Sequence, residues 1–456
     1  MTQPSGDDPI VALASAPGRG AIGVIRLSGR DLGPVLKRLF AAPLQPRYAH
    51  YGPLRDASGD VLDHGIAIHF PSPHSYTGED VLELQAHGGP VVMQLLMQAL
   101  LEIGRPMGLR LARAGEFTER AFLNGKLDLA QAEAVADLID AGSAQAARMA
   151  ARSLAGEFSS EVGAIARAML DTRMVVEAGL DFPEEEIDIL ADGDVLRRVA
   201  TIESDLRELL ATARQGALLR EGMVVAIAGR PNVGKSSLLN ALARAEVAIV
   251  TDLPGTTRDR LSQTVLIDGV PVEIIDTAGL RETDDPVERI GIERARETIG
   301  RADVVLWLVD ARDPDQSVSD RVAADAIAAA RQAGATQLQV LNKIDLTGEE
   351  PGEGDDGGIR LSAKSGAGLE VLRRRLLALA GWQGAGEARF IARERHLQAM
   401  QEAAAHLEAV PQASLAGPEL MAEELRLAHR ALGRITGEVT ADDLLGEIFG
   451  RFCIGK

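Results

Sequence analysis

The sequence predicts a multidomain protein of mixed α/β and α architecture. We expect an α+β domain at the N-terminus, a helical domain in two separate segments, and an α/β domain inserted between them. Three observations support this: an apolar run, Met223–Ala228, leads straight into a glycine-containing loop; strand-like and helix-like segments alternate from there to about Gly381; and alanine- and leucine-rich segments flank that block. The chain of 456 residues has room for roughly two to four domains. The expected segments are residues 1–124, 125–221, 222–381 and 382–456.

The first segment combines strand-like and helix-like patterns. Ala21–Leu27 and Gly65–Phe70 are typical of strands, and Val91–Ile103 is typical of a helix. Residues 78–89 alternate apolar and polar side chains before they end in two glycines, which places Glu83 on the polar face of an expected strand. An edge strand and a turn would account for this segment without any further role.

Helices dominate the second and fourth segments. Charged residues are dense in 113–128, which predicts a helix followed by a second helix with Asp128 as its N-cap. In the fourth segment, apolar residues at helical spacing form two faces, one of Leu425, Ala428, Leu432 and Ile435 and one of Leu445, Ile448, Phe449 and Phe452. The simplest architecture buries the two helical segments against each other. Gly352–Gly358, rich in glycine and acids, is expected to be a loop.

Composition limits the partners and the compartment. A net charge of −19 and an aromatic content of 3% argue against a broad, nonspecific grip on nucleic acid, so RNA contact would need a local basic patch or a basic partner. The acidic stretch Asp181–Asp188 is either a solvated loop or a docking site for a basic partner. One cysteine, Cys453, fits a reducing compartment. With no signal-like start and no membrane-spanning apolar run, we expect a cytoplasmic protein without membrane contact.

The loop after Met223–Ala228 has the composition of a phosphate loop. In Gly229–Ser236 two glycines let the backbone turn its amides toward a phosphate chain, Lys235 can reach the β- and γ-phosphate oxygens, and the Ser236 hydroxyl can bind Mg²⁺. A simple glycine turn would explain the loop alone, but the strand before it and the helix after it favour a nucleotide site.

Further motifs follow in a fixed order and narrow the nucleotide to GTP. Asp276–Gly279 ends a strand with an acid suited to the Mg²⁺ water shell and a glycine amide suited to a γ-phosphate. Asn342–Asp345 offers a carboxylate that can accept the N1 and N2 protons of guanine, a donor pair that adenine lacks. Ser362–Lys364 can offer amides to the guanine O6, and Thr256 and Thr257 lie between the first two motifs. Five elements in this order resemble the translation-factor class of GTPases.

Leu280 indicates that hydrolysis does not use the common glutamine. Leucine cannot orient the attacking water, so another group must do so. Glu288 is the nearest acid in a suitable helix, but Asp285, Pro286 and Glu288 also fit a helix cap, which spacing alone favours. Asn232 could hold a monovalent cation that does the work of an arginine finger, or it could simply be a turn residue.

The ends of the chain carry further motifs, including the tail Phe452–Lys456, which on its own would be frayed and inert. Together with the GTPase motifs, the segments 16–29, 75–89, 112–134, 181–188 and 452–456 closely resemble the MnmE family (also called TrmE) of bacterial tRNA modification GTPases, over essentially the whole chain. In fold, the resemblance implies an N-terminal folate-binding domain, a discontinuous helical domain and an inserted Ras-like P-loop GTPase domain.

The resemblance also implies a reaction. Members of this family, with the flavoprotein partner MnmG (also called GidA), install an aminomethyl or carboxymethylaminomethyl group at C5 of the wobble uridine of certain tRNAs, and GTP hydrolysis is required. The one-carbon unit comes from 5,10-methylenetetrahydrofolate, for which 5-formyltetrahydrofolate is an analogue, bound in the N-terminal domain that also makes the homodimer contact. FAD resides only on the partner, in a heterotetramer or a larger complex.

Site residues follow from the same resemblance. The implied folate contacts are Arg26, Glu83, Lys126 and Lys456. The implied K⁺ ligands, at dimerised GTPase domains, are Asn232, Thr251, Leu253 and Thr256, and the Mg²⁺ ligands are Ser236 and Thr257. Glu288 would orient the water through a second water and joins Lys235 and Asn232 as a catalytic group, so the resemblance favours this role over the cap. For Cys453, packing and chemistry on the one-carbon unit both stay open.

Motifs and resemblance together give one set of expected GTP contacts. They are Asn232, Val233, Gly234, Lys235, Ser236, Ser237, Thr251, Thr256, Thr257, Asp276, Thr277, Ala278, Gly279, Asn342, Lys343, Asp345, Ser362, Ala363 and Lys364. The competing hypothesis is a ribosome-assembly or regulatory GTPase switch. It rests on the GTPase motifs alone and gives no reason for Arg26, Glu83 or Lys126.

Overall fold

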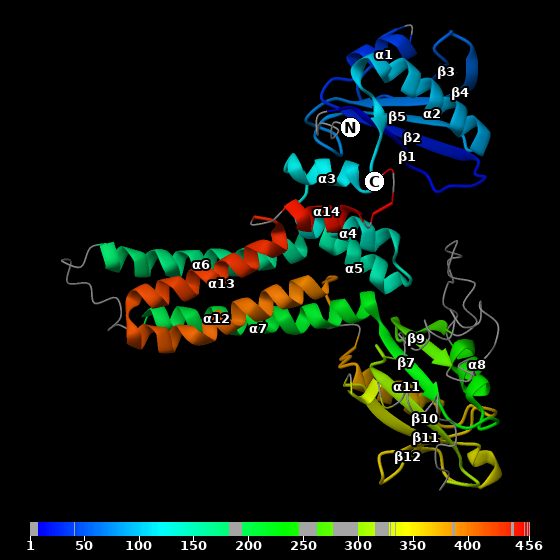
Figure 1. Ribbon diagram of the computed structural model, residues 1–456, viewed down its shortest axis with the longest axis vertical. Coiled ribbons are helices and arrows are strands. Elements are labelled where there is room, and N and C mark those ends of the chain that lie inside the picture. The colour runs from blue at the N-terminus through cyan, green and yellow to red at the C-terminus, as the bar shows by residue number, and fades with distance from the viewer. Residues whose placement is uncertain are drawn as a thin grey trace. The chain divides into compact units, whose positions relative to one another are not determined.

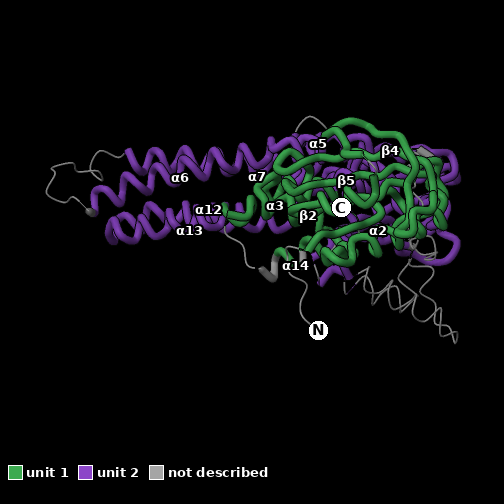
Figure 2. Tube along the Cα trace, turned by 90° about the horizontal axis from the view of Figure 1, so that it is seen from above, with its two compact units in different colours: residues 1–136, 433–456 green, residues 137–432 purple. Residues whose placement is uncertain are grey.

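The structure, a computed structural model, groups the chain into two compact units (Figures 1 and 2). Unit 1 comprises residues 1–136 and 433–456, and unit 2 comprises residues 137–432. The last helix of the chain therefore belongs with the N-terminal unit, while the four segments expected from the sequence remain a prediction. The described residues are 8–40, 42–181, 194–245, 262–276, 300–314, 328, 330–332, 334–384, 388–438, 442–450, 452, 453 and 455.

Unit 1 is built on a six-stranded sheet in the order β3-β4-β5-β2-β1-β6, antiparallel except for the parallel pair β1 and β6. Buried residues of β2 and β5, among them Ile25, Leu27 and Leu84, pack with helices α1 and α2 in one core. Side chains alternate along a strand, so the residues between these, including Arg26 and Glu83, lie on the opposite face of the sheet. The strands are β1 (Ile10–Leu13), β2 (Ile22–Gly29), β3 (His50–Arg55), β4 (Val61–Phe70), β5 (Asp80–His87) and β6 (Arg110–Leu111).

The helices of unit 1 include both ends of the unit's sequence. Helix α14 packs through Phe449 against Phe122 at the end of α3 and Leu129 of α4. The Asp128 carboxylate accepts a hydrogen bond from the backbone amide of Gln131 at 2.8 Å, so the predicted N-cap of α4 is confirmed. The helices are α1 (Gly33–Leu39), α2 (Pro90–Gly104), the 3₁₀ turn η1 (Arg105–Met107), α3 (Glu116–Leu123), α4 (Leu129–Ile139) and α14 (Asp442–Gly450).

Unit 2 begins and ends in long helices. Helix α7 (Asp194–Glu221) packs along α6 (Glu157–Asp181) and α12 (Glu394–Ala416), so helices from before and after the α/β region bury against each other as predicted. The shorter α5 (Ala144–Leu154) and the long α13 (Pro418–Thr436) complete this part. The face of α13 predicted to be apolar is fully buried, at Leu425, Ala428, Leu432 and Ile435.

The α/β region of unit 2 holds a seven-stranded sheet in the order β12-β13-β11-β10-β7-β9-β8. The five central strands are parallel, and β8 and β12 pair antiparallel at the two edges. Gly352 and Glu353 form β12, so the prediction of an uninterrupted loop at Gly352–Gly358 is wrong at these two residues. The strands are β7 (Met223–Ala228), β8 (Ser262–Ile267), β9 (Val270–Asp276), β10 (Val304–Asp310), β11 (Thr336–Asn342), β12 (Gly352–Glu353) and β13 (Ile359–Leu361).

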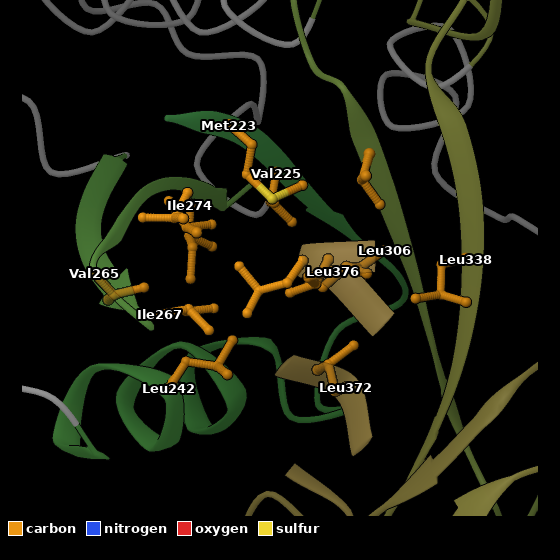
Figure 3. Close-up of a cluster of buried hydrophobic side chains, with 14 of the residues drawn as sticks. Met223, Val225, Leu242, Val265, Ile267, Ile274, Leu306, Leu338, Leu372 and Leu376 are labelled. Carbon is orange, nitrogen blue, oxygen red and sulfur yellow. The ribbon is translucent and has the colours of Figure 1, made fainter. Parts of the chain in front are cut away.

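Helices α8 (Lys235–Ala245) and α11 (Leu369–Leu379) cover the sheet through one apolar core. In Figure 3, Leu242 of α8 and Leu376 of α11 lie over the strand residues Val225, Ile267 and Ile274. Such burial is the main source of stability for a parallel sheet whose strands are apolar throughout. It fixes the direction of β7 and therefore the place where the following loop begins.

Polar contacts hold both chain connections of the α/β region. Before β7, the Gln215 side chain donates to the Gly381 carbonyl at 2.8 Å and accepts from the Gln383 amide at 2.9 Å. After α11, the Ser153 hydroxyl accepts from the Ile391 amide at 3.0 Å. A third contact is made by Asp137, whose Oδ1 lies 2.8 Å from Nε of Arg220 and 2.8 Å from Nη2 of Arg393.

Asp137→Ala is expected to destabilise unit 2. The carboxylate is 7% exposed, and its loss would leave the half-buried guanidinium groups of Arg220 and Arg393 without this acceptor. Removing one partner of a buried pair costs several kcal/mol, and partial exposure of Arg220 places the expected loss near the low end, about 3 kcal/mol. Urea unfolding followed by circular dichroism measures this. The exposed Glu157→Ala should change the midpoint little, and equal midpoints for both variants would contradict the prediction.

Candidate functional site

The described residues of the GTPase motifs lie at one edge of the unit 2 sheet. Because β7, β9, β10, β11 and β13 are parallel, their carboxyl ends lie at the same edge, where ligands bind in open α/β sheets. The loop Gly229–Ser236 follows β7, Asn342 ends β11, and Ser362 follows β13. Motifs more than 100 residues apart in the sequence are thus brought together.

The backbone of the phosphate loop requires glycine at two positions. Gly229 and Gly234 have φ values of 152° and 103°. A Cβ at Gly229 would lie 2.4 Å from the Leu308 carbonyl oxygen, and one at Gly234 would lie 2.3 Å from Nδ2 of Asn342. Helix α8 begins at Lys235, so the first amides of the helix follow the loop directly, as in phosphate-binding loops.

Lys235 and Ser236 lie at the start of α8, directly after the loop. The Lys235 side chain is buried, and Nζ donates to the carbonyls of Gly229 at 2.7 Å and Arg230 at 3.0 Å, which holds the ammonium over the loop. Ser236, in the first turn of α8, is exposed, and its role as a Mg²⁺ ligand stays a prediction. Asn232 is exposed and has a left-handed backbone, with φ 66°, which bears out its reading as a turn residue and leaves the K⁺ role a prediction.

The base-recognition motifs are tied to the phosphate loop. The Asn342 side chain, 2% exposed, donates from Nδ2 to the Val233 carbonyl at 2.8 Å and accepts at Oδ1 from the Ala363 amide at 2.9 Å. Asp345, in the 3₁₀ turn η3 (Ile344–Leu346), is exposed, and its Oδ1 accepts from the Ser362 hydroxyl at 2.6 Å. The carboxylate is therefore held beside the Ser362–Lys364 loop, and recognition of guanine by these residues stays a prediction.

Sequence reasoning missed Asp310. Lys343 donates from Nζ to the Asn232 carbonyl at 2.6 Å and to Oδ2 of Asp310 at 2.8 Å. Hydrogen bonds from Arg312 and the contact with Lys343 hold the pKa of Asp310 far below its usual range. The one signal in the sequence was that Asp310 ends an apolar run, whereas its pairing in register with Asn342 appears only in the structure.

Several predicted site residues lie outside the described residues. They are Thr251, Leu253, Thr256, Thr257, Thr277, Ala278, Gly279, Leu280, Glu288 and Lys456, together with the acidic residues between 182 and 193. Of Asp276 only the backbone is described, at the end of β9, where it pairs with Ile227. The switch-side ligands of Mg²⁺ and K⁺ therefore stay predictions.

In unit 1, Arg26 and Glu83 form an ion pair on the face of the sheet opposite α2. They are register partners on β2 and β5, and Nε of Arg26 donates to Oε1 of Glu83 at 2.9 Å. The guanidinium carbon lies 5.4 Å from the Tyr76 ring centre and 5.9 Å from that of Phe117, within cation–π range. Burial raises the pKa of the Tyr76 hydroxyl, which bonds to Thr118 at 2.9 Å. The charged pair therefore lies beside two aromatic rings, those of Tyr76 and Phe117, which we call the aromatic wall.

Lys126 contacts the loop that carries Tyr76. Its Nζ donates to the Pro73 carbonyl at 3.2 Å, and the neighbouring Asn124 donates from Nδ2 to the Thr77 carbonyl at 2.8 Å. The loop that carries Tyr76 therefore also receives Lys126. Of the four predicted folate contacts, the structure connects Arg26, Glu83 and Lys126 through this loop.

The C-terminal tail packs against other parts of unit 1, so the interpretation of a frayed tail is wrong for its described residues. The Cys453 carbonyl accepts from the Gly115 amide at 3.3 Å, while its side chain is exposed. A Cβ at Gly455 would lie 2.2 Å from the Leu13 carbonyl oxygen, so the tail passes directly against the end of β1. Strand β1 is the neighbour of β2, which carries Arg26.

A buried ionic network beside this wall was not predicted. The carboxylate of Glu79 accepts from the Ser28 hydroxyl at 2.8 Å and from Nη1 of Arg120 at 2.9 Å, and Arg120 also reaches Glu116 at 3.1 Å. Burial raises the pKa of Glu116, but hydrogen bonds from Arg110 and from a backbone amide outweigh it and lower the pKa to about 2. The network anchors α3, which carries Phe117 of the wall.

None of the helices among the described residues is both long and apolar enough to cross a bilayer. In the same part of the chain, no group of three or more His, Cys, Asp and Glu side chains is arranged to hold a metal ion.

Comparison with known proteins identifies relatives along the whole chain. A family model described as the MnmE helical domain matches residues 129–453, and one described as the GTP-binding protein TrmE N-terminus matches residues 9–126. The chain is 55% identical to the tRNA modification GTPase MnmE of Methylibium petroleiphilum, with 100% of both chains covered. It is 57% identical to that of Ralstonia nicotianae, with 98% of this chain and 96% of the relative covered. Among solved structures, the G domain of the T. maritima FeoB iron transporter is 25% identical over 35% of this chain and 98% of that chain, with a TM-score of 0.25.

Proposed function

Because the chain belongs to the MnmE family of tRNA modification GTPases, we propose that it acts with the flavoprotein MnmG to add an aminomethyl or carboxymethylaminomethyl group to C5 of the wobble uridine of certain tRNAs. The observation that carries the proposal is the Arg26–Glu83 pair inside its aromatic wall, because a GTPase that served only as a switch would have no use for it. A tetrahydrofolate would supply the one-carbon unit there.

The residues of unit 1 fit a folate. Both nitrogen contacts of Arg26 with Glu83 are to Oε1, and among the described residues no donor reaches Oε2, so this oxygen can accept a pterin N–H. Tyr76 offers an aromatic face beside the pair. Lys126, and Lys456 by resemblance, would bind the glutamate carboxylates. The docked tail supports the assignment of Lys456, because Gly455 lies against β1.

The GTP site fits Mg²⁺ and K⁺ as far as the described residues extend. Ser236 and Thr257 would hold Mg²⁺, which neutralises charge on the phosphates. Asn232, with Thr251, Leu253 and Thr256, would hold K⁺, which would add the positive charge that an arginine finger gives in other GTPases. The Asn232 carbonyl already accepts from Lys343, so its side-chain amide oxygen is the donor that fits a cation. Glu288 would orient the attacking water, the task of the glutamine that other GTPases have at the position of Leu280.

The proposal extends to partners and compartment. We place the protein in the cytoplasm as a homodimer joined through its N-terminal domains, in a heterotetramer or larger complex with MnmG. Its net charge of −19 supports tRNA contact through the partner or a local basic patch, not through its surface as a whole. Cys453, exposed beside α3, could serve in packing or in chemistry on the one-carbon unit.

Glu83→Gln is expected to remove the wobble-uridine derivative without loss of GTP hydrolysis. A neutral amide lacks the charge of the carboxylate and has one acceptor oxygen where the carboxylate has two, which would reduce folate affinity roughly 10- to 100-fold. Glu83 belongs to a different sheet from the strand that precedes the phosphate loop, so GTP turnover should not change. The measurement is nucleoside mass spectrometry of tRNA from a deletion strain that carries the variant, with GTP turnover assayed on the purified protein.

Glu102→Gln, an exposed acid on α2 of the same unit, is the matched control and should restore the derivative fully. If deletion of the gene itself leaves the nucleosides unchanged, the modification function is wrong and the regulatory switch is favoured. If only Glu83→Gln leaves them unchanged, the folate assignment is wrong and the modification function stands.

A further inference from the structure

Two consecutive carbonyls of the phosphate loop are held by two consecutive residues of the guanine motif. Nζ of Lys343 donates to the Asn232 carbonyl at 2.6 Å, and Nδ2 of Asn342 donates to the Val233 carbonyl at 2.8 Å. In a planar trans peptide the C=O and the following N–H point in opposite directions. Holding these two carbonyls therefore aims the amides of Val233 and Gly234 away from the guanine motif, and both residues are expected phosphate contacts.

The loop needs such a restraint at Asn232. A left-handed backbone is unfavourable for a residue with a Cβ, and Asn tolerates it better than most. Asn232 has φ 66° and is exposed, so its own side chain gains no burial that would offset this strain. The ammonium of Lys343, whose backbone is also left-handed at φ 71°, holds the strained peptide in place.

Asp310 fixes that ammonium. The carboxylate is 10% exposed and sits on the last residue of β10, in register with Asn342, and the Ala311 amide donates to the Asn342 carbonyl at 2.9 Å. The backbone around it is thus anchored in the sheet, and its Oδ2 lies 2.8 Å from Nζ of Lys343. A charged hydrogen bond at low exposure restricts the Lys343 side chain to the position that reaches Asn232.

We propose that Asp310 is a positioning residue for the nucleotide: through Lys343 it sets the orientation of the Asn232–Val233 peptide and so the phosphate-binding amide of Val233. The same chain of contacts turns the Asn232 side chain outward. Its extension to the K⁺ ligand Asn232 rests on the proposed function above, whereas its effect on nucleotide binding requires only a phosphate loop.

Arg312 provides a matched control. It donates to Asp310 from Nε at 3.0 Å and from Nη2 at 2.7 Å, and its side chain is 56% exposed. Among the described residues, its side chain makes no hydrogen bond to the phosphate loop. Truncating Arg312 removes two hydrogen bonds to the carboxylate and leaves Asp310 beside Lys343. If Asp310 mattered only as a local structural anchor, Arg312→Ala and Asp310→Asn would have similar effects.

The test is the release rate of fluorescent GDP from the full-length protein by stopped flow. Asp310→Asn should release GDP about 10-fold faster, Arg312→Ala should stay within about 2-fold of wild type, and Asp310→Glu, which keeps the charge, should recover part of the loss. In a Lys343→Gln background, Asp310→Asn should add little, because both changes break one chain of contacts. Wild-type release from Asp310→Asn, or additive effects of the two changes, would overturn the proposal.

A second readout separates the positioning role from the K⁺ assignment. The K⁺ concentration for half-maximal GTP turnover should rise in Asp310→Asn, in parallel with faster GDP release. If wild-type turnover is equal in K⁺ and Na⁺, the proposed K⁺ site is wrong, while the GDP release rates still decide the role of Asp310. If Asp310→Asn is poorly folded, Asp310→Glu takes its place in the comparison. A GDP release rate equal to that of Arg312→Ala then supports positioning by the charge of residue 310. A GDP release rate as fast as that of Lys343→Gln contradicts the positioning role.

Discussion

Asp345→Asn is expected to weaken GTP binding about 10³-fold and to give the protein affinity for xanthosine triphosphate. The wild-type carboxylate can accept from both N1 and N2 of guanine, and each charged hydrogen bond contributes roughly 1.5–3 kcal/mol. An asparagine keeps one acceptor and replaces the other with a donor. Xanthine has a C2 carbonyl where guanine has an amino group, so it matches the new pair of groups.

The structure supports a clean exchange at this site. Oδ1 of Asp345 accepts from the Ser362 hydroxyl at 2.6 Å, and the Oδ1 of an asparagine could accept the same bond, which would turn its amide nitrogen toward the base. Competition against a fluorescent nucleotide measures both affinities. Asp355→Asn, an exposed acid in the same α/β region, should leave both unchanged. Retained GTP affinity together with rejection of xanthosine triphosphate would refute guanine recognition by Asp345.

The fold was predictable wherever the pattern is local. The sequence pattern predicted strands at Ala21–Leu27 and Gly65–Phe70 and a helix at Val91–Ile103. The first strand falls inside β2 except for its first residue, the second falls inside β4, and the helix falls inside α2. A strand followed by a glycine-containing loop and a helix fixed the phosphate loop, because each part obeys a short-range steric rule. The order of the strands within the two sheets was not predicted, since it depends on which distant segments pair.

The site was predictable only in its motif residues. Lys235, Asn342 and Asp345 have fixed spacing within short motifs, and the structure brings them to one sheet edge. Asp310 belongs to no motif and gains its role only when β10 and β11 lie side by side. The same holds for the buried network of Ser28, Glu79 and Arg120, whose members come from distant segments and whose charges gave no sign that they would pair.

Glu288→Ala is expected to lower GTP turnover roughly 10²- to 10⁴-fold, the range that positioned acids and bases contribute, and to leave GTP affinity close to wild type. With Leu280 in place of the common glutamine, the chain needs another group to orient the attacking water, and Glu288 is the acid that the family resemblance assigns. An interaction made only in the transition state changes kcat without changing binding.

Lys235→Ala provides the contrast that makes this result interpretable. Lys235 is buried in the phosphate loop, and its ammonium bonds to the Gly229 and Arg230 carbonyls, so its loss removes charge from both bound GTP and the transition state. We expect this variant to lose affinity and turnover together, whereas Glu288→Ala loses turnover alone. Calorimetric affinity and single-turnover rates for both variants separate the two patterns. Full turnover in Glu288→Ala would return that residue to the role of a helix cap, and parallel loss of affinity would place it in the binding site and not at the attacking water.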